Sequence, residues 1–272
     1  MLLTSSRANP NAPVDLFSDY DVILVVTDIH PFLEDESWLG DFGDALVVYR
    51  DPVRREYGLE RFARITQYED GTKIDFTVWP VGILGRVVEE AHLPDELEVG
   101  YGVLLDKDGL AARLRPPTCR AFIPAPPSEA VFREVVEEFF HETTYVAKNL
   151  WREELLPAKY SLELMKFDVL RRMLEWHMEG DHGWAVNTGV YGRGLQKRLK
   201  ADIWAQLEST FVGAGMEENW EALFETIDLF RRVAREVADH LGYAYPHDLD
   251  RRVLEYLQRV RSLERGEEDF FE

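Results

Sequence analysis

The chain of 272 residues is poor in cysteine, in long apolar runs and in basic charge. Its single cysteine, Cys119, excludes an intramolecular disulfide and a multi-cysteine zinc site, so we expect a reducing, cytoplasmic location. No apolar stretch approaches the length of a membrane-spanning helix, and the apolar start at residues 1–3 is too short for a signal peptide. The sequence therefore predicts a soluble protein that does not bind membranes.

Acidic residues outnumber basic ones by 51 to 31, which gives a formal net charge of −20. Such a field repels a nucleic-acid backbone and attracts a polycationic ligand to any acidic cleft. Surplus acid equally serves solubility alone, so only acids within a cleft bear on function. With 46% hydrophobic residues, the chain can bury one large core or two modest ones. We expect a monomer that does not bind nucleic acid.

Two carboxylates stand two residues apart before a short apolar run, residues 22–26. Residues i and i+2 of a strand point to the same face, so Asp19 and Asp21 should lie side by side. A divalent cation relieves the repulsion between such carboxylates, and Mg²⁺ prefers hard oxygen ligands of this kind. The alternative is a solvated strand entrance, because short motifs also arise by chance.

A hairpin signal places a third acid on another strand. Asp70 and Gly71 separate two strand-like runs, residues 65–69 and 72–79, and glycine tolerates the positive φ of a tight turn. Polar and apolar residues alternate in the second run, which puts Asp75 on the polar face of a half-buried strand. Asp75 is therefore either a partner of the acidic pair or an ordinary solvent-facing acid.

Small hydroxyl residues follow the first expected strand, residues 2–4. Ser5, Ser6 and Arg7 come directly after it. Backbone N–H groups and hydroxyl side chains in such a turn can hold phosphate oxygens. This turn is therefore a candidate phosphate site.

Proline divides the chain near its middle, at residues 116–117 and 124–127. The part before this boundary, residues 1–123, mixes short strands, such as 45–49, with helical stretches, such as 32–42. The part after it, residues 124–272, is predicted to be a helical bundle. Its helices are expected at residues 128–150, 158–179, 193–211, 217–241 and 247–265. The predicted fold class is α+β.

Short motifs spread over nearly the whole chain match a known family. They are SRAN at 6–9, DYD at 19–21, FG at 42–43, EDGTKID at 69–75, LLDKD at 104–108, TYVAK at 144–148, LRRMLEWH at 170–177, KR at 197–198 and YAYP at 243–246. Together they resemble the aminoglycoside 6-adenylyltransferase (streptomycin adenylyltransferase) family, within the nucleotidyltransferase superfamily of polymerase-β type.

The resemblance implies a mixed β-sheet catalytic domain of nucleotidyltransferase fold over residues 1–123, and a helical substrate- and nucleotide-binding domain over residues 124–272. It implies transfer of AMP from ATP to a hydroxyl of an aminoglycoside, streptomycin, which confers antibiotic resistance. Asp19 and Asp21 would then hold Mg²⁺. Asp75 would either complete the metal shell or act as general base on the acceptor hydroxyl, and we favour the base.

Further binding residues come from the helical half by the same resemblance. Lys148, Lys197 and Arg198 are candidates to meet the nucleotide and its departing pyrophosphate, although a lysine such as Lys148 also serves to cover apolar surface. Glu138 and Glu142 are candidates to pair with ammonium groups of the substrate. Both acids fit equally well on the solvated face of a helix.

Two features depart from the family pattern. Ser5 and Ser6 stand where the superfamily usually carries Gly-Ser, which changes how closely the backbone can approach a phosphate. The family also usually has a helix before the first strand, whereas this chain begins in the strand. Three hypotheses stay open: an aminoglycoside adenylyltransferase, a nucleotidyltransferase with another acceptor, and a degenerate homologue that binds nucleotide or antibiotic without turnover.

Overall fold

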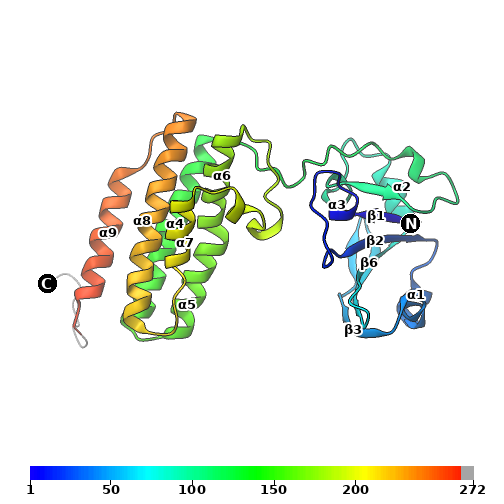
Figure 1. Cartoon of the computed structure of the whole chain (residues 1–272), viewed down its shortest axis with the longest axis horizontal. Helices are drawn as coiled ribbons and strands as arrows, with labels where there is room; N and C mark the ends of the chain where they lie inside the picture. The colour runs from blue at the N-terminus through cyan, green and yellow to red at the C-terminus, as the bar shows by residue number, and fades with distance from the viewer. Residues whose placement is uncertain (265–272) are drawn as a thin grey trace. The chain divides into compact units, whose positions relative to one another are not determined.

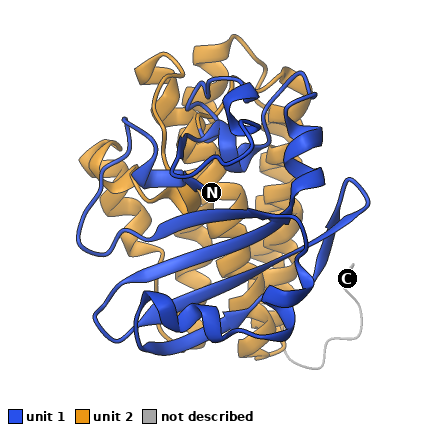
Figure 2. Ribbon diagram, turned by 90° about the vertical axis from the view of Figure 1, so that its right-hand side faces the viewer, with its two compact units in different colours: residues 1–122 blue, residues 123–272 orange. Residues whose placement is uncertain are grey.

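The chain divides into two compact units, Met1–Phe122 and Ile123–Glu272, which Figure 2 shows in separate colours. The computed structural model describes residues 1–264. The catalytic and substrate-binding roles that the sequence suggests for the two parts stay predictions. Across the described residues, no helix is long and apolar enough to cross a membrane.

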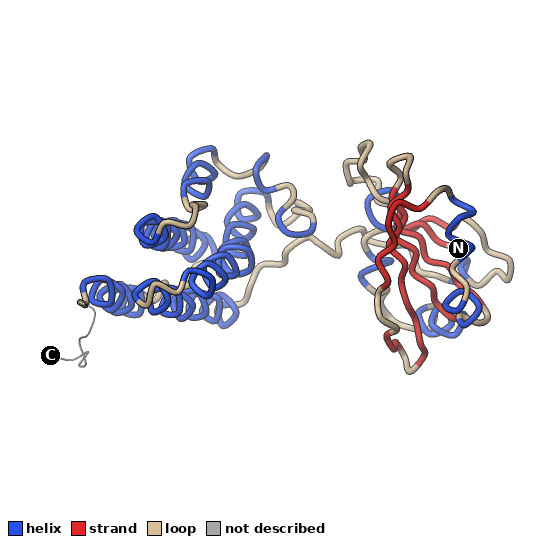
Figure 3. Tube along the Cα trace, turned by 90° about the horizontal axis from the view of Figure 1, so that it is seen from below, coloured by secondary structure: helices blue, strands red, loops and turns tan. Residues whose placement is uncertain are grey.

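Unit 1 is built on a single sheet, drawn in red in Figure 3. Its strands are β1 (Leu2–Thr4), β2 (Tyr20–Val26), β3 (Ala45–Arg50), β4 (Arg54–Glu56), β5 (Leu59–Tyr68), β6 (Lys73–Pro80) and β7 (Tyr101–Val103). They are ordered β3-β5-β6-β2-β1-β7, and β4 pairs with β5. The central strands β2 and β6 run parallel, whereas β1 lies antiparallel to both of its neighbours.

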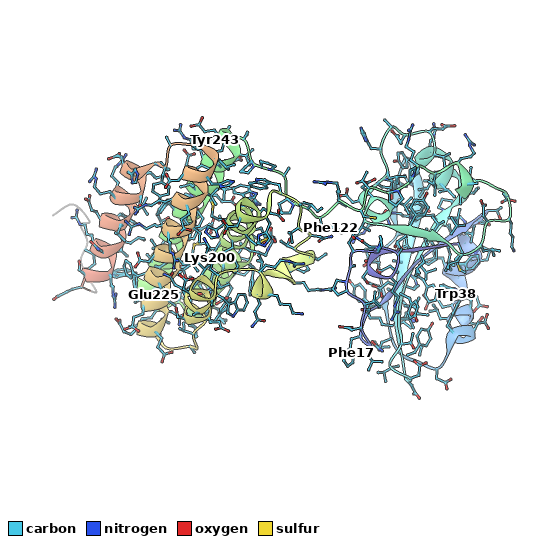
Figure 4. All side chains as sticks on the ribbon, turned by 45° about the horizontal axis from the view of Figure 1, so that its top comes forward. Phe17, Trp38, Phe122, Lys200, Glu225 and Tyr243 are labelled. Atoms are coloured by element: carbon cyan, nitrogen blue, oxygen red, sulfur yellow. The ribbon has the colours of Figure 1, made fainter. Side chains whose placement is uncertain are left out.

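Apolar residues cover both faces of this sheet. Ile23 and Trp79 pack on one face with α2 (Val81–Val87) and α3 (Asp95–Glu98). Phe76 packs on the other face, where Trp38, labelled in Figure 4, meets it edge to face at 5.0 Å between ring centroids. Trp79 is buried on the same face of β6 as Asp75, so the prediction of a half-buried strand is wrong at its carboxyl end.

The hairpin predicted at Asp70 and Gly71 is confirmed, because it joins β5 to β6. Gly71 has a φ of 89°, which glycine adopts without strain. The helical stretch expected at 32–42 is instead two pieces, α1 (His30–Glu34) and the 3₁₀ turn η2 (Ser37–Phe42). Two further 3₁₀ turns are η1 (Ser5–Arg7) and η3 (Ala111–Arg113).

Unit 2 contains helices and no strand in its described part. Its helices are α4 (Glu129–Trp151), α5 (Leu155–Leu164), the π-helical segment η4 (Met165–Leu170), α6 (Arg171–His182), α7 (Ala201–Ser209), α8 (Met216–Leu241) and α9 (His247–Ser262). Helix α4 lies beside α8 and α9, as Figure 1 shows. Phe139 of α4 stacks on Phe230 of α8, with 3.6 Å between ring centroids. Losing a buried phenylalanine side chain costs about 3 to 5 kcal/mol, so this contact strongly stabilises the bundle.

The helix predicted at 128–150 is confirmed as α4, and the Ser128 hydroxyl caps it by accepting a hydrogen bond from the Val131 N–H. The helix predicted at 158–179 extends further, from α5 through η4 to α6. The prediction of one helix at 193–211 is wrong over its first half, which holds the short 3₁₀ turn η6 (Leu195–Lys197) instead. Another 3₁₀ turn, η5 (Val190–Gly192), comes just before it.

The backbone of two residues explains that interruption. Arg198 has a φ of −122°, outside the helical range, and Lys200 has a ψ of 139°. A residue with so large a positive ψ cannot continue a helix, so helix α7 starts only at Ala201. The helices predicted at 217–241 and 247–265 are confirmed as α8 and α9. Residue 265, the predicted end of the last helix, lies outside the described residues.

Candidate active site

Strand register places Asp75 beside the acidic pair predicted to hold a metal. Asp21 of β2 is paired with Asp75 of the parallel neighbour β6, and Asp19 directly precedes β2. Paired residues on neighbouring strands point to the same face of the sheet. The backbone therefore gathers three carboxylates at one end of the central strand pair, whose labels stand side by side in Figure 1.

Lys73 lies among these acids, although the sequence analysis assigns it no role. Its Nζ is 2.5 Å from Oδ2 of Asp19 and 3.2 Å from Oδ2 of Asp75, to both of which it donates hydrogen bonds. The signal that could have found it is its spacing, because Lys73 stands two residues before Asp75 on the same face of β6.

Burial shapes the protonation of this cluster. Burial raises the pKa of Asp21, and the charge of Asp75 raises it further, while a hydrogen bond from the Ser5 hydroxyl works against both. Burial also raises the pKa of Asp75, against the hydrogen bond from Lys73. Burial by itself lowers the pKa of Lys73, but its hydrogen bonds to Asp19 and Asp75 outweigh it, so that pKa is raised. The site thus holds more negative charge than its single ammonium neutralises.

The donor atoms fit a hard divalent cation. Oδ1 of Asp75 is buried without a hydrogen-bond partner, although it lies 3.1 Å from Nζ of Lys73. Carboxylate oxygens are the ligands that Mg²⁺ prefers. Among residues 1–264, however, no three acidic, histidine or cysteine side chains are already grouped as a metal centre. A metal at this site would therefore need the carboxylates and Lys73 to rearrange.

Arg7 is tied to the backbone that leads into β2. Its Nε donates to the carbonyl oxygens of Ser18 and Asp19, and its NH2 group donates to that of Ser18 at 2.8 Å. Its guanidinium also stacks on the ring of Tyr20, 3.8 Å from the centroid. These contacts fix the segment that carries Asp19. The predicted contact of Arg7 with a phosphate stays a prediction.

Ser5 adopts the backbone conformation that glycine favours. Its φ is 61°, in the left-handed region, where the superfamily usually has glycine. Ser5 and Ser6 form η1 with Arg7, both serines are partly exposed, and the Ser5 hydroxyl donates a hydrogen bond to Asp21 of β2. The substitution therefore keeps the shape of the turn, and the phosphate role of the two serines stays a prediction.

Three predicted residues of unit 2 lie along one helix. Glu138, Glu142 and Lys148 all belong to α4, on the side away from its buried apolar residues. Glu138 is exposed, and Glu142 lies 3.8 Å from Nδ1 of His141. Lys148 is partly buried, with Nζ 4.3 Å above the ring centroid of Tyr145. Glu138 and Glu142 are four residues apart and share one face of α4, whereas Lys148, six residues after Glu142, points about 120° away from it.

The other two predicted cations lie in the irregular segment before α7. Lys197 closes the 3₁₀ turn η6, and Arg198 follows it. Both side chains are exposed, and NH1 of Arg198 donates to the Gly194 carbonyl at 3.4 Å. Their predicted role in binding nucleotide stays a prediction.

Comparison with known proteins identifies the family. The family model of streptomycin adenylyltransferase matches residues 1–260. The chain belongs to this family. Aminoglycoside 6-adenylyltransferase of Bacillus subtilis (strain 168) is 32% identical over 261 residues, which cover 95% of this chain and 89% of that protein. The protein of the same name from Campylobacter jejuni is 30% identical, with 95% and 88% covered.

A solved structure agrees with this assignment to the streptomycin adenylyltransferase family. The crystal structure of an aminoglycoside 6-adenyltransferase from Bacillus subtilis matches with a TM-score of 0.50 at 26% identity, over 96% of this chain and 92% of that one. The family and the α+β fold class expected from the sequence are therefore confirmed. The chain is an adenylyltransferase, as the sequence predicted.

Proposed function

We propose that this protein transfers AMP from ATP to a hydroxyl group of streptomycin in a Mg²⁺-dependent reaction, and so confers resistance to that antibiotic. The observation that carries the proposal is the register of β2 and β6, which sets Asp21 beside Asp75 with Asp19 two residues upstream. Family membership supports the reaction class, and the names of the relatives support an aminoglycoside as acceptor.

In the proposed reaction, the acceptor oxygen forms a bond to the α-phosphorus of ATP. The bond from that phosphorus to the oxygen bridging to the β-phosphate breaks, and pyrophosphate leaves with the electron pair. Asp75 takes the proton of the acceptor hydroxyl. Burial raises its pKa, which makes its carboxylate a stronger base than an exposed aspartate.

Asp19 and Asp21 are the residues that we assign to Mg²⁺. A bound magnesium ion supplies charge neutralisation for the phosphate groups in such a transfer. Arg7 keeps the Asp19 backbone in place through the Ser18 and Asp19 carbonyls. Ser5 and Ser6, on the turn after β1, are assigned to the phosphate oxygens.

Residues of unit 2 are assigned to the acceptor and the leaving group. Glu138 and Glu142 on α4 are proposed to pair with ammonium groups of the aminoglycoside. Lys148, Lys197 and Arg198 are proposed to meet the phosphates. The net charge of −20 favours the approach of a polycationic antibiotic.

A cytoplasmic location follows from the proposed use of ATP, and the protein is proposed to act as a monomer.

The direct test is mass spectrometry of the purified protein incubated with ATP, Mg²⁺ and a panel of aminoglycosides. We expect one AMP unit on streptomycin and none when Mg²⁺ is chelated. The Asp21→Asn variant is the matched control, and it should leave the antibiotic unmodified. AMP on a different acceptor would replace streptomycin in the proposal, and absence of any AMP transfer would contradict it.

A further inference from the structure

Lys73 is the cation closest to the proposed metal ligands. Unit 1 contains two lysines, Lys73 and Lys107. Nζ of Lys73 lies within 3.2 Å of oxygens from both Asp19 and Asp75, and its side chain remains 31% exposed. Lys107 is exposed in the loop after β7. The ammonium of Lys73 therefore lies among the oxygens that a metal ion would use.

We propose that Lys73 is a resident counter-ion, which holds the carboxylates together in the metal-free protein and is displaced when metal and nucleotide bind together. This inference rests on the proposed function, because it takes Asp19, Asp21 and Asp75 as the residues around the metal. It assigns Lys73 a positioning role that competes with the metal for the same oxygens.

Lys73 and a metal ion compete for the carboxylate oxygens for two reasons, charge and space. Three carboxylates so close together repel one another, and the ammonium at 2.5 Å from Asp19 relieves that repulsion. Mg²⁺ coordinates oxygens at about 2.0 to 2.1 Å, so it needs the lone pair that Lys73 now occupies on Asp19. An ammonium and a divalent cation also repel each other. The metal can take its full set of oxygens only if Lys73 moves away.

The Lys73 side chain can move away from the carboxylates. Lysine carries a compact charge on a flexible four-carbon stem, and the partial exposure of Lys73 opens a route to solvent. The phosphates of a nucleoside triphosphate can form a new ion pair with the released ammonium, whereas a metal ion alone provides no anion for it. Metal binding should therefore be weak by itself and stronger with nucleotide, a positive coupling between the two ligands.

Mn²⁺ is a suitable probe, because its binding to the full chain can be followed without nucleotide by calorimetry and electron paramagnetic resonance. Lys73→Met removes the competing charge and keeps the length of the stem. We expect it to bind Mn²⁺ about ten-fold more tightly than the unmodified protein, since a unit charge about 4 Å away is worth at least that order in a partly solvated site. Its metal-free form should melt at a lower temperature, and added Mn²⁺ should raise that temperature more.

Two matched variants separate the inference from a general charge effect. Lys107→Met makes the same change in net charge, near the other end of β1, and should bind Mn²⁺ as weakly as the unmodified protein. Lys73→Arg retains a cation and should do the same. Lys73→Gln provides a second neutral variant if Lys73→Met does not fold.

Equal or weaker Mn²⁺ binding by the neutral Lys73 variants would overturn the inference, as would tight binding by Lys73→Arg. AMP transfer to streptomycin by the unmodified protein is measured separately. Transfer without any gain of Mn²⁺ affinity in Lys73→Met would leave the proposed function standing and remove the counter-ion role. A gain of affinity without transfer would support the counter-ion and contradict the proposed function.

Discussion

The two units of this protein place their charged residues in different ways. In unit 1, the candidate residues Asp21 and Asp75 sit on adjacent paired strands, and Lys73 bonds to Asp19 and Asp75. In unit 2, Phe139 and Phe230 belong to one continuous apolar core, and the candidate residues stand on its surface. Backbone pairing fixes the geometry of the first group, whereas in the second only Glu138, Glu142 and Lys148 are related to one another, by the spacing of helix α4.

Catalysis and substrate recognition require different degrees of precision in the placement of charged groups. Reaction at phosphorus needs ligands and base held within a fraction of an ångström, which a sheet provides. Recognition of a flexible polycation needs charge in the right region, which exposed glutamates on a helix can supply. We therefore expect substitutions in unit 1 to affect catalysis most, and substitutions on α4 to affect antibiotic affinity.

The largest expected effect comes from the metal ligands. Asp19→Asn or Asp21→Asn should reduce turnover by about 10³-fold or more, because a bound metal supplies several kcal/mol of transition-state stabilisation. The metal-free melting temperatures should differ between the two variants. Asp21→Asn should melt higher, because burial and the charge of Asp75 disfavour its carboxylate, whereas Asp19→Asn loses the ion pair with Lys73. Near-normal turnover in either variant would refute the metal assignment.

Asp75→Asn should lower the rate of the chemical step by about 10²- to 10⁴-fold, the range expected for loss of a general base. The affinity for ATP with Mg²⁺ should change little, since Asp19 and Asp21 remain. Rapid-quench kinetics measures the first quantity and nucleotide titration at fixed Mg²⁺ the second. A large loss of nucleotide affinity would make Asp75 a metal ligand rather than the base.

Local sequence pattern was enough to predict these acids but not their arrangement. Asp19 and Asp21 share a face through i, i+2 spacing, and the turn at Asp70 and Gly71 places Asp75 on a strand. The pairing of Asp21 with Asp75 joins residues 54 apart in a parallel register, which no local pattern determines. The same long-range pairing brings Asp19 to Lys73, which is why no role for that lysine could be predicted from local pattern.

Arg7 tests whether unit 1 depends on backbone placement. Arg7→Gln removes the hydrogen bonds to the Ser18 and Asp19 carbonyls, and should lower turnover by about 10²-fold, since a 1 Å shift of a reacting group can cost that much. Arg7→Lys keeps the charge but not the forked donor geometry, so it should be impaired similarly. If Arg7 instead acts by its charge on phosphate, Arg7→Lys should restore most activity in steady-state assays.

Unit 2 was harder to predict in its details. The stripe of apolar residues in α4 is strongly periodic, so that helix was predicted almost to its ends. The failure at 193–211 arose because Arg198 and Lys200 leave the helical conformation, which the apolar pattern does not reveal. Exposed residues such as Glu138 have no packing pattern at all, so only the resemblance to the family suggested them.

The smallest expected effect comes from Glu138. If its carboxylate makes a charge-assisted hydrogen bond to the antibiotic, Glu138→Gln should weaken streptomycin binding by about 1 to 3 kcal/mol. Added salt should weaken that binding more than it weakens binding of ATP with Mg²⁺. Glu225→Gln is the control, because Glu225, labelled in Figure 4, is an exposed glutamate on α8. Equal effects of the two substitutions at low salt would assign Glu138 to the solvated surface.

Separate roles for the two units are tested most directly by calorimetry on two full-length variants, each titrated with ATP in Mg²⁺ and with streptomycin. The account predicts a crossed result: Asp21→Asn loses nucleotide binding and keeps streptomycin, whereas Glu138→Gln keeps nucleotide and loses affinity for streptomycin. Unimpaired nucleotide binding by Asp21→Asn, or loss of nucleotide binding by Glu138→Gln, would contradict it.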